Sequence, residues 1–266
     1  MSTKPRRPVD GRGDCPICGS QRKLTDEDIV PTWARKYLIG LAPFGPRDQR
    51  PSRITMRICI TCNSRMAKVF EDRCSSLIKP MLDGSQVCLS HREQSQISAW
   101  IVKTSLLITA MGLPRDAPDR DRSLALVRHL IDERIPPAQT LVRLFLHSMA
   151  DEEVATGHVP SEALAPPTAF FSISSVGSLG WEMAIGPTLP ILEYQSRTSG
   201  RQGFVQVWPP VNRQVFWPPA TPIGTADIKR LRSAYLSSSR PGIASPVIRQ
   251  WQWPGPASSD PRTPLS

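Results

Sequence analysis

The clearest pattern in the chain is a helical repeat of apolar residues that begins at Asn63. Apolar side chains recur there at three- and four-residue steps, and the charged residues fall off that face. The repeating positions are Met66, Val69, Phe70, Cys74, Leu77 and Ile78. Because proline disrupts a helix interior, we expect Pro80 to end this helix. A shorter helix is expected to begin at Pro31 and to end near Gly40.

Three further stretches between residues 91 and 150 repeat apolar residues with helical spacing, and we expect helices of a packed core there. Their stripes are Ile97, Trp100, Ile101, Thr104, Ile108 and Met111, then Leu124, Val127, Leu130 and Ile131, then Leu141, Leu144, Phe145 and Met149. The longest apolar segment, Ile97 to Leu113, also carries Lys103 and several hydroxyl groups. Those polar residues indicate a buried amphipathic helix rather than a membrane span.

Short runs rich in β-forming residues replace the helical spacing beyond residue 168. The runs AFFSISSV, GWEMAI, GFVQVW and RQVFW are separated by Gly, Pro and Ser, which predicts a small antiparallel sheet. Thr225 can cap one helix that follows. Two earlier strands are expected at Arg22 to Thr25 and in the segment ITMRICI, residues 54–60. The chain is therefore predicted to belong to the α+β class.

Four of the six cysteines form two pairs of identical spacing, Cys15 with Cys18 and Cys59 with Cys62. Zinc binds four thiolates tetrahedrally, and two C-x-x-C turns offer that geometry with little strain. The pairs are separated by 40 residues, more than in a short zinc ribbon, so that segment must itself fold. We predict one structural zinc ion bound by these four residues. The two remaining cysteines, Cys74 and Cys88, are expected to be buried thiols.

The formal net charge of +10 is concentrated near the N-terminus. Residues 1–80 hold 16 Lys and Arg against 8 Asp and Glu, whereas residues 81–266 hold 17 against 15. A regional positive charge is typical of a surface that binds phosphate backbones, and a merely solvated face is the alternative. The basic residues expected to contact nucleic acid are Arg22, Lys23, Arg35, Lys36, Arg57, Arg65 and Lys68.

These patterns divide the chain into five segments. Residues 1–13 are expected to be a disordered basic arm and residues 14–85 a zinc module. Residues 86–160 form the helical region, and residues 161–237 form the small sheet with one helix. Residues 238–266, rich in proline and serine, are expected to be a disordered tail. Because the N-terminus lacks the apolar run of a secretory signal and no membrane span is expected, we predict a cytoplasmic protein.

The order CPICG, LTDEDIVPTW and ICITCNSRMAKVFED, within residues 15 to about 80, resembles the HNH endonuclease superfamily. That family has an E-H-x-x-P segment at a strand end and a C-x-x-C-[HN] knuckle that opens a helix. The resemblance implies a ββα zinc-knuckle module in which Glu27 and Asn63 help to hold a catalytic Mg²⁺ or Mn²⁺ ion. It also implies that the partner is nucleic acid, DNA above all, and that a histidine deprotonates the water that cleaves the phosphodiester.

Two positions depart from the family pattern. Asp28 stands where the family has its histidine, and Ile54 and Thr55 stand where an asparagine usually precedes the second cysteine pair. An aspartate with an ordinary pKa of ~3.9 is a weak base at neutral pH, but its oxygens suit Mg²⁺ or Mn²⁺. The four histidines all lie outside the motif: His91, His129, His147 and His158.

The candidate catalytic residues also have ordinary structural roles. The segment Thr25 to Asp28 can cap the turn before Pro31, and Asn63 is a favoured helix N-cap. Three functions therefore stay open. The chain is a nucleic-acid-binding zinc protein that cleaves DNA with a divalent metal, a noncatalytic zinc-stabilised DNA- or RNA-binding module, or a protein-interaction factor that works through its C-terminal sheet.

Overall fold

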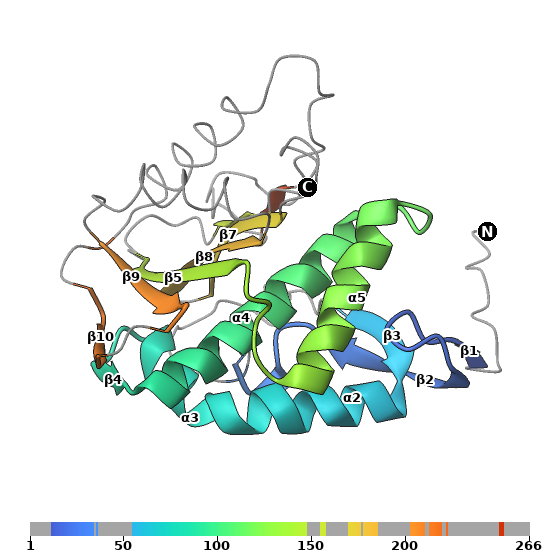
Figure 1. The fold of residues 1–266 in the computed structure, drawn as a ribbon, viewed down its shortest axis with the longest axis horizontal. Helices are drawn as coiled ribbons and strands as arrows, with labels where there is room; N and C mark the ends of the chain where they lie inside the picture. The colour runs from blue at the N-terminus through green and yellow to red at the C-terminus, as the bar shows by residue number, and fades with distance from the viewer. Residues whose placement is uncertain are drawn as a thin grey trace, which may run out of the picture.

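The computed structural model describes residues 12–34, 36, 55–147, 155–157, 170–176, 178–185, 203–210, 213–219, 222 and 250–252. Within that part of the chain the fold mixes helices with small antiparallel sheets, as the α+β prediction requires. A long helix, α4, lies between a helical rod on one side and a four-stranded sheet on the other (Figure 1). A separate three-stranded sheet packs against the N-terminal end of the rod (Figure 1).

The three-stranded sheet consists of β1 (Arg12–Asp14), β2 (Gln21–Asp28) and β3 (Thr55–Cys59), all antiparallel in the order β1-β2-β3. Both predicted strands are present, and β2 runs three residues further than expected. The first two residues of β1 belong to the segment expected to be a disordered arm. Of the helix predicted to begin at Pro31, residues 32–34 and 36 are helical, and the rest lies outside the described residues.

The helical rod consists of α2 (Ile60–Met66), a π-helical turn η2 (Ala67–Glu71) and α3 (Asp72–Leu82). It begins at Ile60 rather than Asn63, because Cys59 is still extended and its thiol caps the first turn. The prediction that Pro80 ends the helix is wrong, since α3 continues for two residues beyond it. The buried side chains recur at four-residue steps along the rod, at Met66, Phe70, Cys74, Ile78 and Leu82.

Two long helices follow the rod. Helix α4 (His91–Gly112) begins with a capping box in which Ser90 and Glu93 bond each other's backbone N–H, and α5 (Pro118–Glu133) begins at a proline. Helix α4 is buried on most of its sides, including Lys103, whose Nζ lies 3.3 Å from Glu71 Oε1. None of the helices in the described ranges is long and apolar enough to cross a membrane.

The four-stranded sheet has the order β7-β8-β5-β9 with every neighbouring pair antiparallel. Its strands are β5 (Thr140–Leu146), β7 (Phe170–Val176), β8 (Leu179–Ile185) and β9 (Phe204–Trp208). Three of these strands were predicted, but the helix predicted through Leu141 and Phe145 is wrong. Nearly every residue of β5 is buried, so the strand lacks the alternation of polar and apolar residues that identifies a half-exposed strand.

Two short ribbons complete the described fold. Strand β4 (Val87–Leu89) pairs with β10 (Val215–Trp217), so the predicted strand RQVFW leaves the larger sheet. Strand β6 (Ala155–Gly157) pairs with β11 (Gln250–Gln252), which lies in the segment expected to be a disordered tail. The helix predicted after Thr225 and the remainder of that tail lie outside the described residues.

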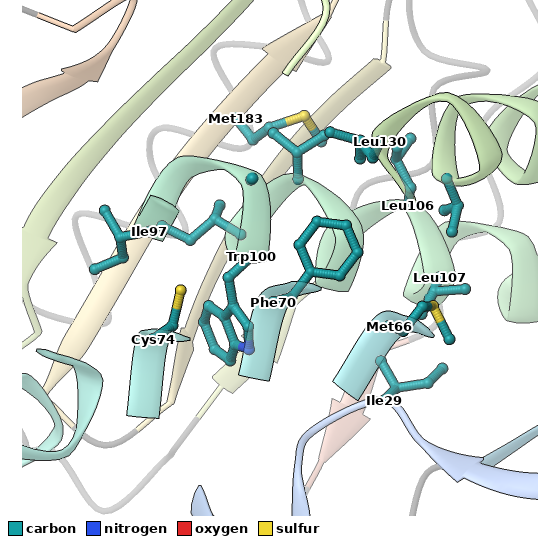
Figure 2. Close-up of a cluster of buried hydrophobic side chains, with 14 of the residues drawn as sticks. Ile29, Met66, Phe70, Cys74, Ile97, Trp100, Leu106, Leu107, Leu130 and Met183 are labelled. Carbon is teal, nitrogen blue, oxygen red and sulfur yellow. The ribbon is translucent and has the colours of Figure 1, made fainter. Parts of the chain in front are cut away.

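One hydrophobic core joins these parts. Ile29 follows β2, Met66 and Phe70 come from the rod, and Trp100 and Met183 come from α4 and β8 (Figure 2). All five are fully buried. The three-stranded sheet and the rod are therefore supported by the same apolar contacts that hold α4 against the larger sheet.

Candidate metal centre

The four cysteines predicted to bind zinc come together at the junction of the three-stranded sheet and the rod. Their Sγ atoms all lie within 4.8 Å of one another, and those of Cys18 and Cys59 are 3.7 Å apart. Four sulfurs at about 2.3 Å from a tetrahedral zinc ion are separated by about 3.8 Å. The four-cysteine cluster can therefore hold a metal ion, and its geometry and ligands are compatible with zinc.

Local backbone geometry shapes both halves of the four-cysteine cluster. The turn after β1 closes at Gly19, whose positive φ of 71° suits glycine and whose N–H donates to Cys15 O at 2.7 Å. The second pair uses the change from strand to helix, because Cys59 ends β3 while Cys62 lies in the first turn of α2. Each C-x-x-C spacing thus places two thiols on one side of a tight backbone turn.

Hydrogen bonds to sulfur link the two halves. The Cys59 N–H donates to Cys15 Sγ and the Cys62 N–H donates to Cys59 Sγ, each at 3.4 Å. The Ser20 hydroxyl lies 3.0 Å from Cys18 Sγ. Donors aimed at sulfur favour the thiolate, which is the form that binds a metal.

These surroundings lower the pKa of some of the four thiols and raise that of another. The Ser20 hydroxyl is the main reason that the pKa of Cys18 is lowered to about 6. Burial raises the pKa of Cys59, but hydrogen bonds, first that from the backbone N–H of Cys62, outweigh burial and hold this pKa below its ordinary value. Burial raises the pKa of Cys62 far above its ordinary value. A metal ion that binds at neutral pH must therefore displace the proton of Cys62.

The candidate catalytic residues Glu27 and Asp28 lie buried at the end of β2. Asn63 reaches the same strand from α2, because its Nδ2 donates to Thr25 Oγ1 at 3.0 Å. Side chains alternate along a strand, so Thr25 and Glu27 share one face of β2 and Asp28 lies on the other. Asp28 accepts a hydrogen bond from the Thr32 hydroxyl at 2.6 Å. The structure thus brings Asn63 to the face that carries Glu27.

The structure also bears on the capping roles that the sequence suggested for these residues. Asn63 is not the helix N-cap, since that position is taken by Cys59. The Thr25 hydroxyl bonds Asn63 and the carbonyl of Ile58. Across the described part of the chain, the four-cysteine cluster is the one group of three or more His, Cys, Asp or Glu side chains close enough to share a metal ion. The assignment of Glu27, Asp28 and Asn63 to catalysis, with Mg²⁺ or Mn²⁺, stays a prediction.

The predicted basic residues that the structure describes lie on the surface of residues 14–85. Every one whose side chain is described is exposed: Arg22, Lys23, Lys36, Arg57, Arg65 and Lys68. Arg35 lies outside the described residues. Arg22 Nη1 donates to Thr61 Oγ1 at 3.0 Å, and Arg65 Nη2 lies 2.8 Å from Asp132 Oδ1. Lys23, Arg57 and Lys68 make no ion pair with another described residue, so their charge remains available to a partner.

The other two cysteines differ from each other. Cys74 is buried as predicted, its Sγ donates to the Gln96 carbonyl at 3.3 Å, and burial raises its pKa to about 12. The prediction that Cys88 is buried is wrong, because it lies on the exposed side of β4.

Sequence reasoning missed the polar partners of these groups. Ser20, beside the first cysteine pair, and Thr25, two positions before Glu27, were visible in the sequence as hydroxyls near the motif. The buried pair of Arg143 and Glu182 had no such signal. It exists only because the register of β5 and β8 sets the two residues opposite each other.

In comparisons with family models, with curated proteins and with solved structures, none matched this chain. The resemblance to HNH endonucleases therefore stays a prediction from the sequence, and the functional argument depends on the residues of the centre and its surface.

Proposed function

We propose that this protein binds nucleic acid through an HNH-like N-terminal module that a structural zinc ion stabilises. The observation that carries the proposal is the convergence of four thiols within 4.8 Å. A zinc ion there would tie the turn after β1 to the start of the rod. The module would then present its charged side chains from a rigid scaffold.

The positive charge on this module favours nucleic acid as the partner. Arg22, Lys23 and Arg57 are exposed on the three-stranded sheet, and Arg65 and Lys68 are exposed on the rod. Most of this charge is not used within the described fold. Exposed cations on a rigid surface displace the counterions of a phosphate backbone, so they bind nucleic acid in a salt-dependent way.

The first test measures metal content and binding on the full chain. Elemental analysis should find about one zinc ion per chain, because four thiolates complete one tetrahedral site. Fluorescence polarisation with labelled DNA and RNA should give affinities that fall steeply as salt rises. The triple variant Arg22→Ala, Arg57→Ala, Lys68→Ala should weaken binding and flatten the dependence on salt.

A matched control keeps this test specific. Arg92, Arg115 and Arg128 are exposed outside the zinc module, so replacing all three by alanine removes the same charge from another surface. We expect the control variant to bind nearly as the parent does. Equal losses in the two triple variants, or binding that ignores salt, would overturn the proposal and favour the protein-interaction factor.

Metal-dependent cleavage of DNA is a second candidate function, and one contact favours it. Asn63 is held by Thr25 on the face of β2 that carries the buried Glu27, so the first and last positions of the family motif lie on one face of that strand. Glu27 and Asn63 would hold a Mg²⁺ or Mn²⁺ ion at one face of β2. Asp28 leaves the other face and is a candidate only by its place in the family motif. Such an ion supplies stabilisation of the leaving oxygen. Without a histidine, solvent would have to accept the proton from the attacking water.

Cleavage is tested with plasmid and single-stranded DNA across Mg²⁺, Mn²⁺, Ni²⁺ and Zn²⁺. Alanine at Glu27, Asp28 or Asn63 should abolish the activity, and unchanged cleavage in all three variants would refute the assignment. Asp28→His restores the family's base and should raise the rate, because a positioned base contributes about 10²–10⁴-fold. Absence of cleavage with every metal, beside intact salt-dependent binding, would leave the noncatalytic binding module.

A further inference from the structure

An exposed isoleucine sits between the metal-binding residues. Ile60 is the first residue of α2, next to Cys59 and two positions before Cys62, and its side chain is 54% exposed. It is one of only three large apolar side chains that are exposed in the described ranges, with Ile135 and Phe216. With a metal bound to Cys59 and Cys62, the backbone that carries Ile60 is fixed on both sides. The side chain therefore projects from a rigid support.

The surroundings of Ile60 are cationic and rich in hydroxyl groups. Thr61 is exposed and accepts the hydrogen bond that holds the Arg22 guanidinium beside the start of the helix. Ser64, Arg65 and Lys68 are exposed on the following turns. Because residues three and four apart share a helix face, Thr61, Arg65 and Lys68 form one row that leads away from Ile60. At a rise of about 1.5 Å per residue, the row extends about 12 Å from Ile60.

This combination suits nucleic acid better than an apolar partner. A protein or lipid surface that covered Ile60 would have to desolvate the neighbouring arginines and lysine for the gain of a single side chain. A nucleic acid strand uses both, since its phosphates pair with the cations while its base steps accept an apolar side chain. We propose that Ile60 inserts at a base step of the bound nucleic acid, with Arg22 beside it and Lys68 further along the row on phosphates.

The proposal deepens the proposed function and rests on it. Insertion requires a base step to unstack, and the cost is lowest where a nucleotide is unpaired or mismatched. The preferred ligand is therefore a duplex with a bulged or mismatched nucleotide rather than an uninterrupted duplex. The row of cations supplies affinity for either ligand, whereas Ile60 supplies the discrimination between them.

The experiment compares two labelled duplexes of one length and sequence, one of which carries a single central bulge. The full-length, metal-loaded protein should bind the bulged duplex roughly tenfold more tightly at fixed salt, given a saving of part of the unstacking cost. Ile60→Ala should bind the two duplexes equally, with the affinity for the plain duplex and its salt dependence preserved. Ile60→Phe, with a larger insert, should widen the preference. Arg22→Ala should weaken binding to both duplexes by the same factor.

Phe216→Ala is the control, because Phe216 is 68% exposed and belongs to β10, at the opposite end of the molecule from β1, β2 and β3 (Figure 1). This variant should keep the preference of the parent. Equal binding of the two duplexes by the parent, or a preserved preference in Ile60→Ala, would overturn the inference while the proposed function stands. Failure of the parent to bind either duplex would overturn both. Binding to phosphatidylserine vesicles that Ile60→Ala abolishes would overturn the inference in favour of a lipid surface.

Discussion

The four-cysteine cluster and the four-stranded sheet each join two distant stretches of chain through polar groups. The two regions differ in how far their strands are exposed to solvent. Cys18 and Cys59 are 41 positions apart, and Arg143 and Glu182 are 39 positions apart. The first pair closes a thin, partly exposed sheet, where β2 begins with three exposed residues. The second pair lies inside strands that are buried almost throughout. The sulfur cluster thus lies beside a strand that is exposed at its start, whereas the ion pair is enclosed by buried strands.

The sheet shows what a buried charge requires instead. Arg143 Nε donates to Glu182 Oε2 at 2.8 Å, its Nη2 donates to the same oxygen, and its guanidinium lies 4.9 Å from the centre of the Phe204 ring. An ion pair costs desolvation on both sides, so it is tolerated only with several such contacts. One region can thus be closed by an added ion, whereas the other is held by contacts among its own side chains.

Removal of a metal ion from the four-cysteine cluster is expected to produce the largest effect. It should destabilise the three-stranded sheet and leave the four-stranded sheet intact. Structural zinc sites are worth about 10–16 kcal/mol in apparent binding free energy, so chelation or Cys59→Ser should unfold the three-stranded sheet. Hydrogen exchange should show lost protection of amides in β2 and β3, while β5 and β8 stay protected. Cys88→Ser, at an exposed thiol outside the cluster, should change nothing. A uniform loss of protection across both regions would show that the metal supports the whole core.

Glu182→Ala should destabilise the four-stranded sheet. It leaves the Arg143 charge buried, and loss of one partner of a buried pair costs about 3–5 kcal/mol. Urea denaturation should measure this loss, and elemental analysis should find the metal content unchanged. The surface pair of Arg122 and Asp119 offers a control, because Asp119→Ala should cost only about 0–1 kcal/mol. A small effect of Glu182→Ala would contradict the view that the pair is mutually dependent.

Gly180→Ala tests the packing inside the four-stranded sheet, and its expected effect on stability is smaller. Gly180 faces Phe145 across the strand pair, and a Cβ at position 180 would overlap the ring of Phe145. Overpacking of this kind costs about 1–3 kcal/mol in the free energy of unfolding. Gly112→Ala is the control, since a Cβ at the end of α4 meets no atom within 4 Å. Equal thermal midpoints of the two variants would contradict this packing.

The smallest expected effect is on thiol reactivity in the core that the two regions share. Because burial raises the pKa of Cys74 to about 12, this thiol stays protonated far above its ordinary range. Its burial as a neutral group stabilises the fold below the ordinary pKa, and that contribution is lost as pH rises toward 12. In metal-loaded protein at pH 8 to 9, iodoacetamide should modify the exposed Cys88 and leave Cys74 intact. Mass spectrometry would detect rapid modification of Cys74, which would contradict its placement.

The two regions also differ in how far the sequence alone could predict them. The four-cysteine cluster was accessible because a C-x-x-C pair is a local signal, and two such pairs need only meet. Strand β5 was not accessible, because Leu141, Leu144 and Phe145 fit a helical face as well as a strand buried on both sides. Only its neighbours β8 and β9 decide the matter, and they lie 33 and 58 positions beyond the end of β5.

Proline and lysine gave the other misleading signals. Pro80 lacks the N–H that a helix interior uses, yet Met81 and Leu82 behind it are fully buried, and this burial keeps the last turn helical. A lysine side chain is seldom fully buried, whereas Lys103 is buried against Glu71 of the π-helical turn. In both places a tertiary contact outweighs a preference that the local sequence expresses.

The π-helical turn at Ala67–Glu71 has a consequence for direction. A strict α-helix turns by about 100° per residue, so a row of side chains spaced by four drifts steadily around it. The wider turn offsets part of that drift, and it lets Met66 above it and Cys74 below it face the same core. The direction in which Arg65 and Lys68 leave the rod is thereby fixed by apolar packing along the same rod. Packing in the core therefore determines which way the charged surface faces.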